Sequence, residues 1–307
     1  MVNKFVRIFI LISFTFTSLT GLYSCVSDEG GEIEIPPKED FLVNQEDHIG
    51  GSIKAQDVVE NISSPIEMAA LIQNHGVPFS LKYLAPTQNV ANYTTNFEKA
   101  LALGVFGADL GYLNIYEKTG SIISYISAIR DLSEALNIGN FFDFQSIKNL
   151  ATNNGDLDSL MYLSVKSFNN MDDYLRKNDK GNISSLIVAG IWIEGLYLAT
   201  QVVKEKHNVA IAERIGEQKS TLDQLLILLK AYKDDPYFAA LIKDFEELKD
   251  AYKDVQIEYQ LGDPETIDKD GMLIIIQKSI SIVTISEEQL ENIINIVEKK
   301  RNKLISL

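Results

Sequence analysis

The chain has few of the side chains that most often carry chemistry. Its 307 residues include one cysteine, one tryptophan and three histidines. With a single thiol no disulfide can form within the chain, so a disulfide-stapled module is excluded. His48, His75 and His207 do not occur at the His-x-x-x-His or Glu-x-x-His spacing of zinc proteases and di-iron helices. We expect neither a metal nor a cofactor.

Motifs for nucleophilic catalysis and phosphate binding are also missing. No Gly-x-Ser-x-Gly sequence is present, and three histidines give little basis for a catalytic triad. Gly104, Gly107 and Gly111 do not form a phosphate-binding loop, because they lie within a helical pattern rather than after a strand. We predict that they make a smooth helix face against which another helix packs closely.

One short acidic segment suggests a calcium loop, Asp268-Lys269-Asp270-Gly271. If Gly271 took the turn position, Gln277 would stand where a calcium loop needs a bidentate glutamate. A surface turn is therefore the favoured interpretation.

Acidic residues clearly outnumber basic ones. The chain has 43 Asp and Glu against 28 Lys and Arg, which gives a formal net charge of −15 at pH 7. Removal of residues 1–24 would take away two positive charges and no negative ones, and the net charge would become −17. Nucleic acid and anionic lipid surfaces repel such a protein. We expect no nucleic-acid partner.

The N-terminal residues have the layout of a secretory signal. A basic head with Lys4 and Arg7 precedes an apolar run over residues 8–22, which is shorter than a spanning helix and rich in hydroxyl residues. The run ends at Leu22-Tyr23-Ser24-Cys25, which resembles a bacterial lipobox with Tyr23 as an unusual residue. The resemblance implies cleavage before Cys25 and its modification by diacylglycerol and a fatty acid such as palmitate. The alternatives are an ordinary signal peptide and an uncleaved anchor.

The residues after Cys25 are typical of a flexible linker, because acidic residues, paired glycines and prolines cannot build a core. We predict a signal peptide at 1–24, a lipidated cysteine and acidic linker at 25–50, and a helical globular domain at 51–307. Ser27-Asp28-Glu29 resembles the acidic signal that exports some Bacteroidota lipoproteins to the cell surface. The resemblance implies a lipid anchor in the outer membrane facing outward, with a periplasm-facing anchor as the alternative.

Apolar residues at three- and four-residue spacing predict a mainly α, bundle-like single domain. Ser64-Pro65-Ile66-Glu67 is a typical helix start, and that helix is expected to end at Gly76. The further helices are predicted at 89–118, 121–136, 145–152, 157–177, 183–206, 209–232, 237–254 and from 286 onward. Gly120, Gly139, Gly155 and Gly181 are expected to end helices. Alternating apolar residues and turn signals predict a small antiparallel β element near residues 256–284.

Two carboxylates, Asp109 and Glu194, stand alone in stretches apolar enough to be buried. A buried carboxylate must be paired or neutralised, and we predict Arg130 and Arg214 as the partners. The favoured interpretation is a buried polar network that fixes helix register. The alternative is an acid/base pair of the glycosidase type, with nearby aromatic residues as sugar platforms: Tyr112, Tyr116 and Trp192.

Several segments together resemble a group of uncharacterised helical lipoproteins of Bacteroidota. They are the lipobox, the acidic residues after it, Ser64-Pro65-Ile66-Glu67, Gly107-Ala108-Asp109-Leu110-Gly111-Tyr112 and Gly216-Glu217-Gln218-Lys219. The resemblance implies the compartment and a helical fold over most of the mature chain. It carries no activity, and only Cys25 receives a role from it.

Two functions are therefore compatible with the sequence. The first is a non-catalytic lipoprotein that is held in the bilayer by acylated Cys25 and binds an envelope protein or another ligand. The second is a hydrolase that acts on envelope or dietary glycan through Asp109 and Glu194. A cleft with the two carboxylates about 5–10 Å apart would favour the hydrolase, and burial between helices would favour the binding module.

Overall fold

The structure is a computed structural model, and it describes residues 71–152, 157–261, 265–269, 272–276 and 279–306. All of these residues belong to the unit Lys38–Leu307. The predicted signal peptide, Cys25, the acidic linker and the helix start at Ser64 lie outside them.

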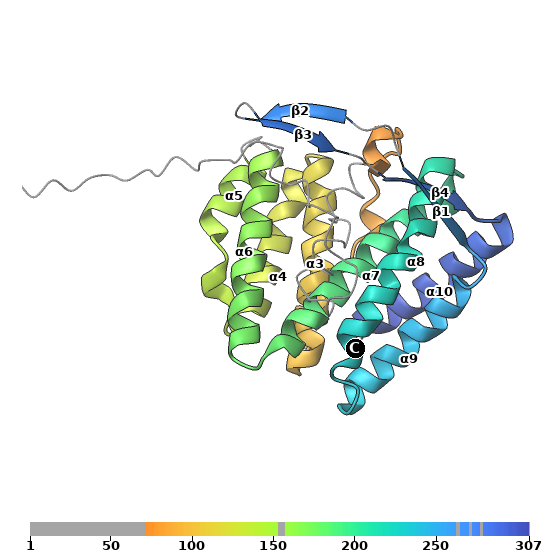
Figure 1. Cartoon of the computed structure of the whole chain (residues 1–307). Coiled ribbons are helices and arrows are strands. Elements are labelled where there is room, and N and C mark those ends of the chain that lie inside the picture. Colours follow the sequence, from red (N-terminus) through yellow and green to blue (C-terminus); the bar gives the residue numbers. More distant parts are fainter. Residues whose placement is uncertain (1–70, 153–156, 262–264, 270–271, 277–278, 307) are drawn as a thin grey trace, which may run out of the picture. The chain divides into compact units, whose positions relative to one another are not determined.

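The described residues are mainly α-helical, as predicted (Figure 1). The helices are α3 (Asn96–Ile115), α4 (Thr119–Ala135), α5 (Phe144–Thr152), α6 (Leu157–Lys177), α7 (Gly181–Glu205), α8 (Val209–Lys230), α9 (Pro236–Ala251) and α10 (Glu287–Ile305). Short 3-10 helices occur at η3 (Leu81–Tyr83), η4 (Thr87–Asn92) and η5 (Gly139–Phe141). Helices α3 and α7 form the most extensive helix pair. On one flank, α4 packs on α3, α6 packs on α7, and α5 lies between α4 and α6. On the other flank, α8 and α10 both pack on α7, and α9 packs on both of them.

The central pair consists of two helices that are apolar on nearly every side, which is the pattern of a buried helix. Helix α7 is the one helix among the described residues that is long and apolar enough to cross a membrane. However, 94% of its apolar window is buried inside the protein. Its apolar surface is therefore used for packing against the neighbouring helices.

The predicted close approach of helices occurs at Gly104 of α3. A Cβ atom there would overlap the carbonyl oxygen of Ile187 and lie 2.7 Å from the amide nitrogen of Ile191. Gly190 of α7 completes the contact, since a Cβ atom added there would overlap the carbonyl oxygen of Leu101. A Cβ atom added at Gly107 would meet nothing within 4 Å. The two backbones therefore touch at Gly104 and Gly190, and Gly107 takes no part in this contact.

The helix ends differ from the prediction that glycines terminate them. Gly76 does follow a helix end with φ +69°, but Gly120 and Gly181 lie in the first turns of α4 and α7. Gly139 begins η5, and Gly155 lies outside the described residues. The left-handed residues after α3, α4 and α6 are Glu117, Asn137 and Asp179, with φ between 53° and 59°. In each case the next amide bonds a carbonyl five residues back at 2.7–2.9 Å, which closes the helix without glycine.

The predicted β element is present as two antiparallel pairs. Strand β1 (Gln256–Leu261) pairs with β4 (Ser279–Thr284), and β2 (Glu265–Lys269) pairs with β3 (Met272–Ile276). Asp268 and Lys269, which were expected in a surface turn, belong to β2. The Gly216–Lys219 segment of α8 holds the element: the Val283 side chain fills the space beside Gly216, and Ser281 Oγ donates a hydrogen bond to Glu217. Lys219 Nζ donates to the carbonyl oxygen of Val255 at 2.6 Å, just before β1.

Candidate functional site

The two singled-out carboxylates, Asp109 on α3 and Glu194 on α7, lie in one buried cluster. Both residues have 0% exposed surface. Their charge partner is Arg301 on α10, which is itself 3% exposed. The cluster therefore joins the central helix pair to α10 in the interior.

Arg301 binds Glu194 through two nitrogens of its guanidinium group. Nε donates to Oε2 at 2.7 Å and Nη2 to Oε1 at 2.6 Å. Nη2 also donates to the carbonyl oxygen of Tyr83 at 3.1 Å. The guanidinium carbon lies 4.2 Å from the centre of the Tyr197 ring. This planar two-point geometry is the strongest form of ion pair available to a buried carboxylate.

Asp109 is held on its other side by the segment that precedes α3. Its Oδ2 accepts a hydrogen bond from the Ala85 amide at 2.9 Å, and Tyr125 Oη donates to the Ala85 carbonyl at 2.7 Å. Its Oδ1 is buried and has no hydrogen-bond donor among the described residues. Burial raises the pKa of Asp109 well above its usual value, and the negative charge of Glu194 raises it further. Arg301 and the Ala85 amide lower the pKa of Asp109 by less.

The partners predicted from the sequence, Arg130 and Arg214, are not the ones that the structure gives to this cluster. Arg130 is exposed on α4, with its guanidinium carbon 5.2 Å from the centre of the Phe144 ring. Arg214 forms an ion pair with Glu217 at 2.8 Å on α8. The sequence did contain a signal for Arg301. The apolar positions Leu290, Ile293, Ile294 and Val297 extend by three- and four-residue steps to 301 and Leu304, which puts Arg301 on the buried face.

The aromatic residues near the carboxylates belong to the packing and to buried hydrogen bonds. Trp192 is 3% exposed, and its Nε1 donates to Gln218 Oε1 at 2.9 Å. Tyr112 is fully buried, and Tyr116 Oη donates to the carbonyl oxygen of Val77 at 2.7 Å. A glycosidase pair needs carboxylates and platforms that a sugar can reach. Asp109 and Glu194 do not reach the surface, so the geometry supports the structural interpretation.

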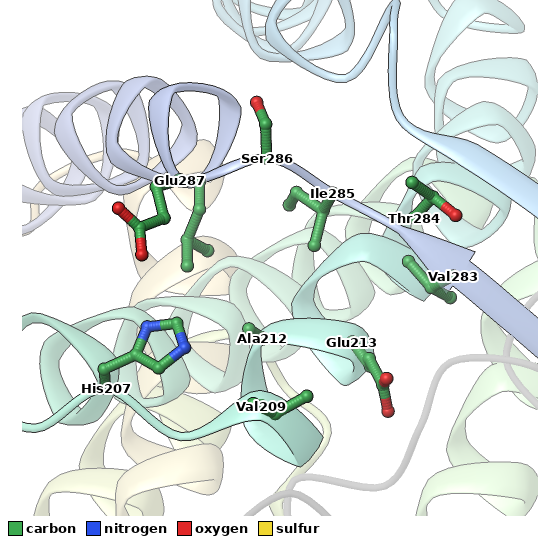
Figure 2. Close-up of a pocket in the computed structure, with 10 residues that line it drawn as sticks. His207, Val209, Ala212, Glu213, Val283, Thr284, Ile285, Ser286 and Glu287 are labelled. Carbon is green, nitrogen blue, oxygen red and sulfur yellow. The ribbon is translucent and has the colours of Figure 1, made fainter.

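A shallow groove of about 300 Å³ opens elsewhere, between the start of α8 and the connection from β4 to α10. Figure 2 shows His207 opposite Glu287 at one end and Glu213 toward the other. The rest of the lining is mostly apolar, with Thr284 and Ser286 beside five apolar side chains: Val209, Ala212, Val283, Ile285 and Leu290. The groove has room for an aliphatic side chain of a partner. Its polar residues do not form a metal centre, since no cluster of three or more His, Cys, Asp or Glu suited to a metal occurs in the described part of the chain.

Comparison with known proteins adds no family. No protein-family model matches the chain, and neither a curated protein nor a solved structure does. Function must therefore be inferred from the residues themselves.

Proposed function

We propose that this protein is a lipid-anchored lipoprotein of the cell envelope that binds a partner and catalyses no reaction. The observation that carries the proposal is the apolar N-terminal run ending at Leu22-Tyr23-Ser24-Cys25. The buried cluster gives further support. Asp109 and Glu194 were the residues that suggested catalysis, and both are engaged inside the domain.

The proposed anchor is strong enough to be permanent. Each buried methylene contributes about 0.8 kcal/mol, and a single chain binds a bilayer only reversibly. Two or three acyl chains on Cys25 would hold the protein stably without any help from the acidic domain. Ser27-Asp28-Glu29 favours anchoring in the outer membrane with the domain at the cell surface; the periplasmic face is the alternative.

Replacement of the cysteine tests the anchor. We expect Cys25→Ala to abolish incorporation of labelled palmitate and to release the protein from the membrane fraction. Tyr23→Ala is the matched control, because it changes the neighbouring residue and keeps the thiol, so labelling should persist. Retention of the alanine variant in the membrane would refute the anchor. Protease treatment of whole cells then separates the two faces, since only a surface-exposed domain is digested.

The binding half of the proposal is tested by cross-linking in intact cells. Val209 lines the groove of Figure 2 and Ile227 lies elsewhere on α8, and both are exposed, at 62% and 52%. If a partner inserts a side chain into the groove, Val209→Arg loses the cross-link and Ile227→Arg keeps it. A partner-binding role is contradicted if the wild-type protein gives no specific cross-linked species. A hydrolase acting through Asp109 and Glu194 is the alternative function, and no contact in the structure favours it.

A further inference from the structure

We propose that Asp109 carries a proton in the folded protein and that its Oδ1–H donates to the Glu194 carboxylate. The hydrogen-bonded cluster then needs one bound proton. It joins residues 83–85 to helices α3, α7 and α10. The inference concerns the domain alone and does not depend on the lipidation of Cys25.

The hydrogen-bond inventory of the cluster requires that proton. Both oxygens of Glu194 accept from Arg301, and Oδ2 of Asp109 accepts from the Ala85 amide. Oδ1 of Asp109 is buried without a donor in the described part of the chain. Two ionised carboxylates have only acceptors, so they cannot bond to each other. A proton on Oδ1 turns the unsatisfied acceptor into a donor, and Glu194 is the side chain whose hydrogen bond with Asp109 raises the pKa of Asp109.

The charge count leads to the same conclusion. The cluster holds one guanidinium and two carboxyl groups, so two ionised carboxyls would leave one negative charge uncompensated in the buried interior. One proton makes the cluster neutral. The two-point pair with Arg301 gives Glu194 two charged donors, whereas Asp109 has a single backbone donor. The proton therefore belongs on Asp109, in agreement with the direction of its pKa.

Among the described residues, the charged groups that act most strongly on Asp109 are Glu194 and Arg301. The other titratable groups that interact with Asp109 are tyrosines: Tyr93 before α3, Tyr112 on α3, Tyr125 on α4 and Tyr197 on α7. Burial raises the pKa of each, to about 12 for Tyr93, so all four are uncharged at neutral pH. The charges that face Asp109 are those of Glu194 and Arg301.

A consequence is that folding takes up a proton. The pKa of Asp109 is higher in the folded protein than in the unfolded chain, where it is about 3.9. Above that unfolded value the unfolding equilibrium shifts toward the unfolded state by up to tenfold per pH unit. The shift continues until the pH passes the folded pKa of Asp109. The stability that the protonated Asp109 gives to the fold is therefore complete below the unfolded pKa and falls steadily as the pH rises above it.

Asp109→Asn removes the titration and keeps the geometry, because the amide can donate to Glu194 and accept from Ala85. We would measure urea unfolding of the mature protein and of this variant from pH 5 to pH 8. As the pH increases, the unfolding constant of the wild type divided by that of the variant should rise by up to tenfold per pH unit. Asp131→Asn is the control, because Asp131 is exposed on α4 and its loss should leave the wild-type slope unchanged. Equal slopes in the wild type and Asp109→Asn would overturn the proposal.

A second measurement does not require a folded variant. In wild-type protein carrying ¹³C-labelled aspartate carboxyls, one resonance should remain at the chemical shift of a protonated carboxyl at pH 7. Its absence from the folded protein at that pH would also overturn the proposal. In Glu194→Gln, if it folds, Asp109 is the carboxyl left to neutralise Arg301, and we expect that resonance to move to the ionised position.

Discussion

Lys300 and Arg301 are neighbours on α10, yet they bind acidic residues in two very different surroundings. Arg301 faces Glu194 and Asp109 in the sealed centre of the domain. Lys300 faces α9 at the edge, where it bonds Asp244 at 2.7 Å and also pairs with Glu247. Lys303 adds a second cation to Asp244 at 2.6 Å. The side chain of Glu247 is 47% exposed, so water reaches this second cluster.

The two aspartates respond in opposite directions. Burial raises the pKa of Asp244, but hydrogen bonds and charges from Lys300 and Lys303 together outweigh it and lower the pKa. For Asp109, burial and the charge of Glu194 outweigh the single guanidinium and raise the pKa. The edge cluster has two cations for two carboxylates, and the central one has one cation for two. The ratio of charges in the enclosed space decides whether an acid ionises or keeps its proton.

The largest expected effect comes from removing the central cation. Arg301→Met leaves the Glu194 charge buried without a partner and should cost about 3–5 kcal/mol in the free energy of unfolding. Lys300→Met is the matched control, and its loss should be smaller because Asp244 keeps Lys303 and Glu247 is half-exposed. Urea unfolding at pH 7 measures both. Equal losses in the two variants would contradict the distinction between the clusters.

A conservative exchange should separate charge from geometry. Arg301→Lys keeps the positive charge but cannot span both Glu194 oxygens and the Tyr83 carbonyl, so we expect a loss of about 1–3 kcal/mol. The reverse exchange at the edge, Lys300→Arg, should change stability less because the positive charge remains, Asp244 keeps Lys303 and Glu247 is half-exposed. Thermal or urea unfolding gives both values. A fully stable Arg301→Lys variant would show that charge alone holds the centre.

The pH dependence of the edge cluster should have the opposite sign to that of Asp109. Asp244 has a lowered pKa in the folded protein, so it stabilises the fold above its unfolded pKa of about 3.9 and loses this contribution as the pH falls through its folded pKa. Asp244→Asn should therefore be most destabilising at neutral pH and match the wild type in strong acid. Urea unfolding between pH 3 and pH 7 tests this. A difference that grows toward acid would be inconsistent with the ion pairs to Lys300 and Lys303.

The smallest expected effect is that of salt. Raising the ionic strength from about 0.05 M to 1 M screens exposed charges much more than buried ones. The destabilisation caused by Lys300→Met should shrink by a few tenths of a kcal/mol, and that caused by Arg301→Met should stay the same. The comparison uses the same urea titrations at two salt concentrations. An equal salt response would mean that water also reaches the central cluster.

The sequence was informative wherever a local pattern determines local structure. The predicted helix over 157–177 has the bounds of α6, and the helix predicted from 286 onward is α10, with Ser286 as its N-cap and a capping box with Gln289. The burial of Asp109 and Glu194 also followed from their apolar surroundings. The cationic partner of these carboxylates did not follow from the sequence. Arg301 is 107 residues from Glu194 and lies in a Lys- and Arg-rich stretch that resembles a solvated helix face. Pairing over such a distance depends on how helices pack, and periodicity along one helix does not specify it.

The order of the cluster along the chain has a consequence for synthesis. A ribosome makes Asp109 and Glu194 well before Arg301, so for much of translation the two acids have no guanidinium to pair with. An incomplete chain that buries α3 against α7 must first neutralise both carboxyls by protonation, or leave them in water. The central helix pair therefore has a reason to remain open until α10 has been synthesised. Helix α10, made after the central pair, thus supplies the group that allows α3 to be buried against α7.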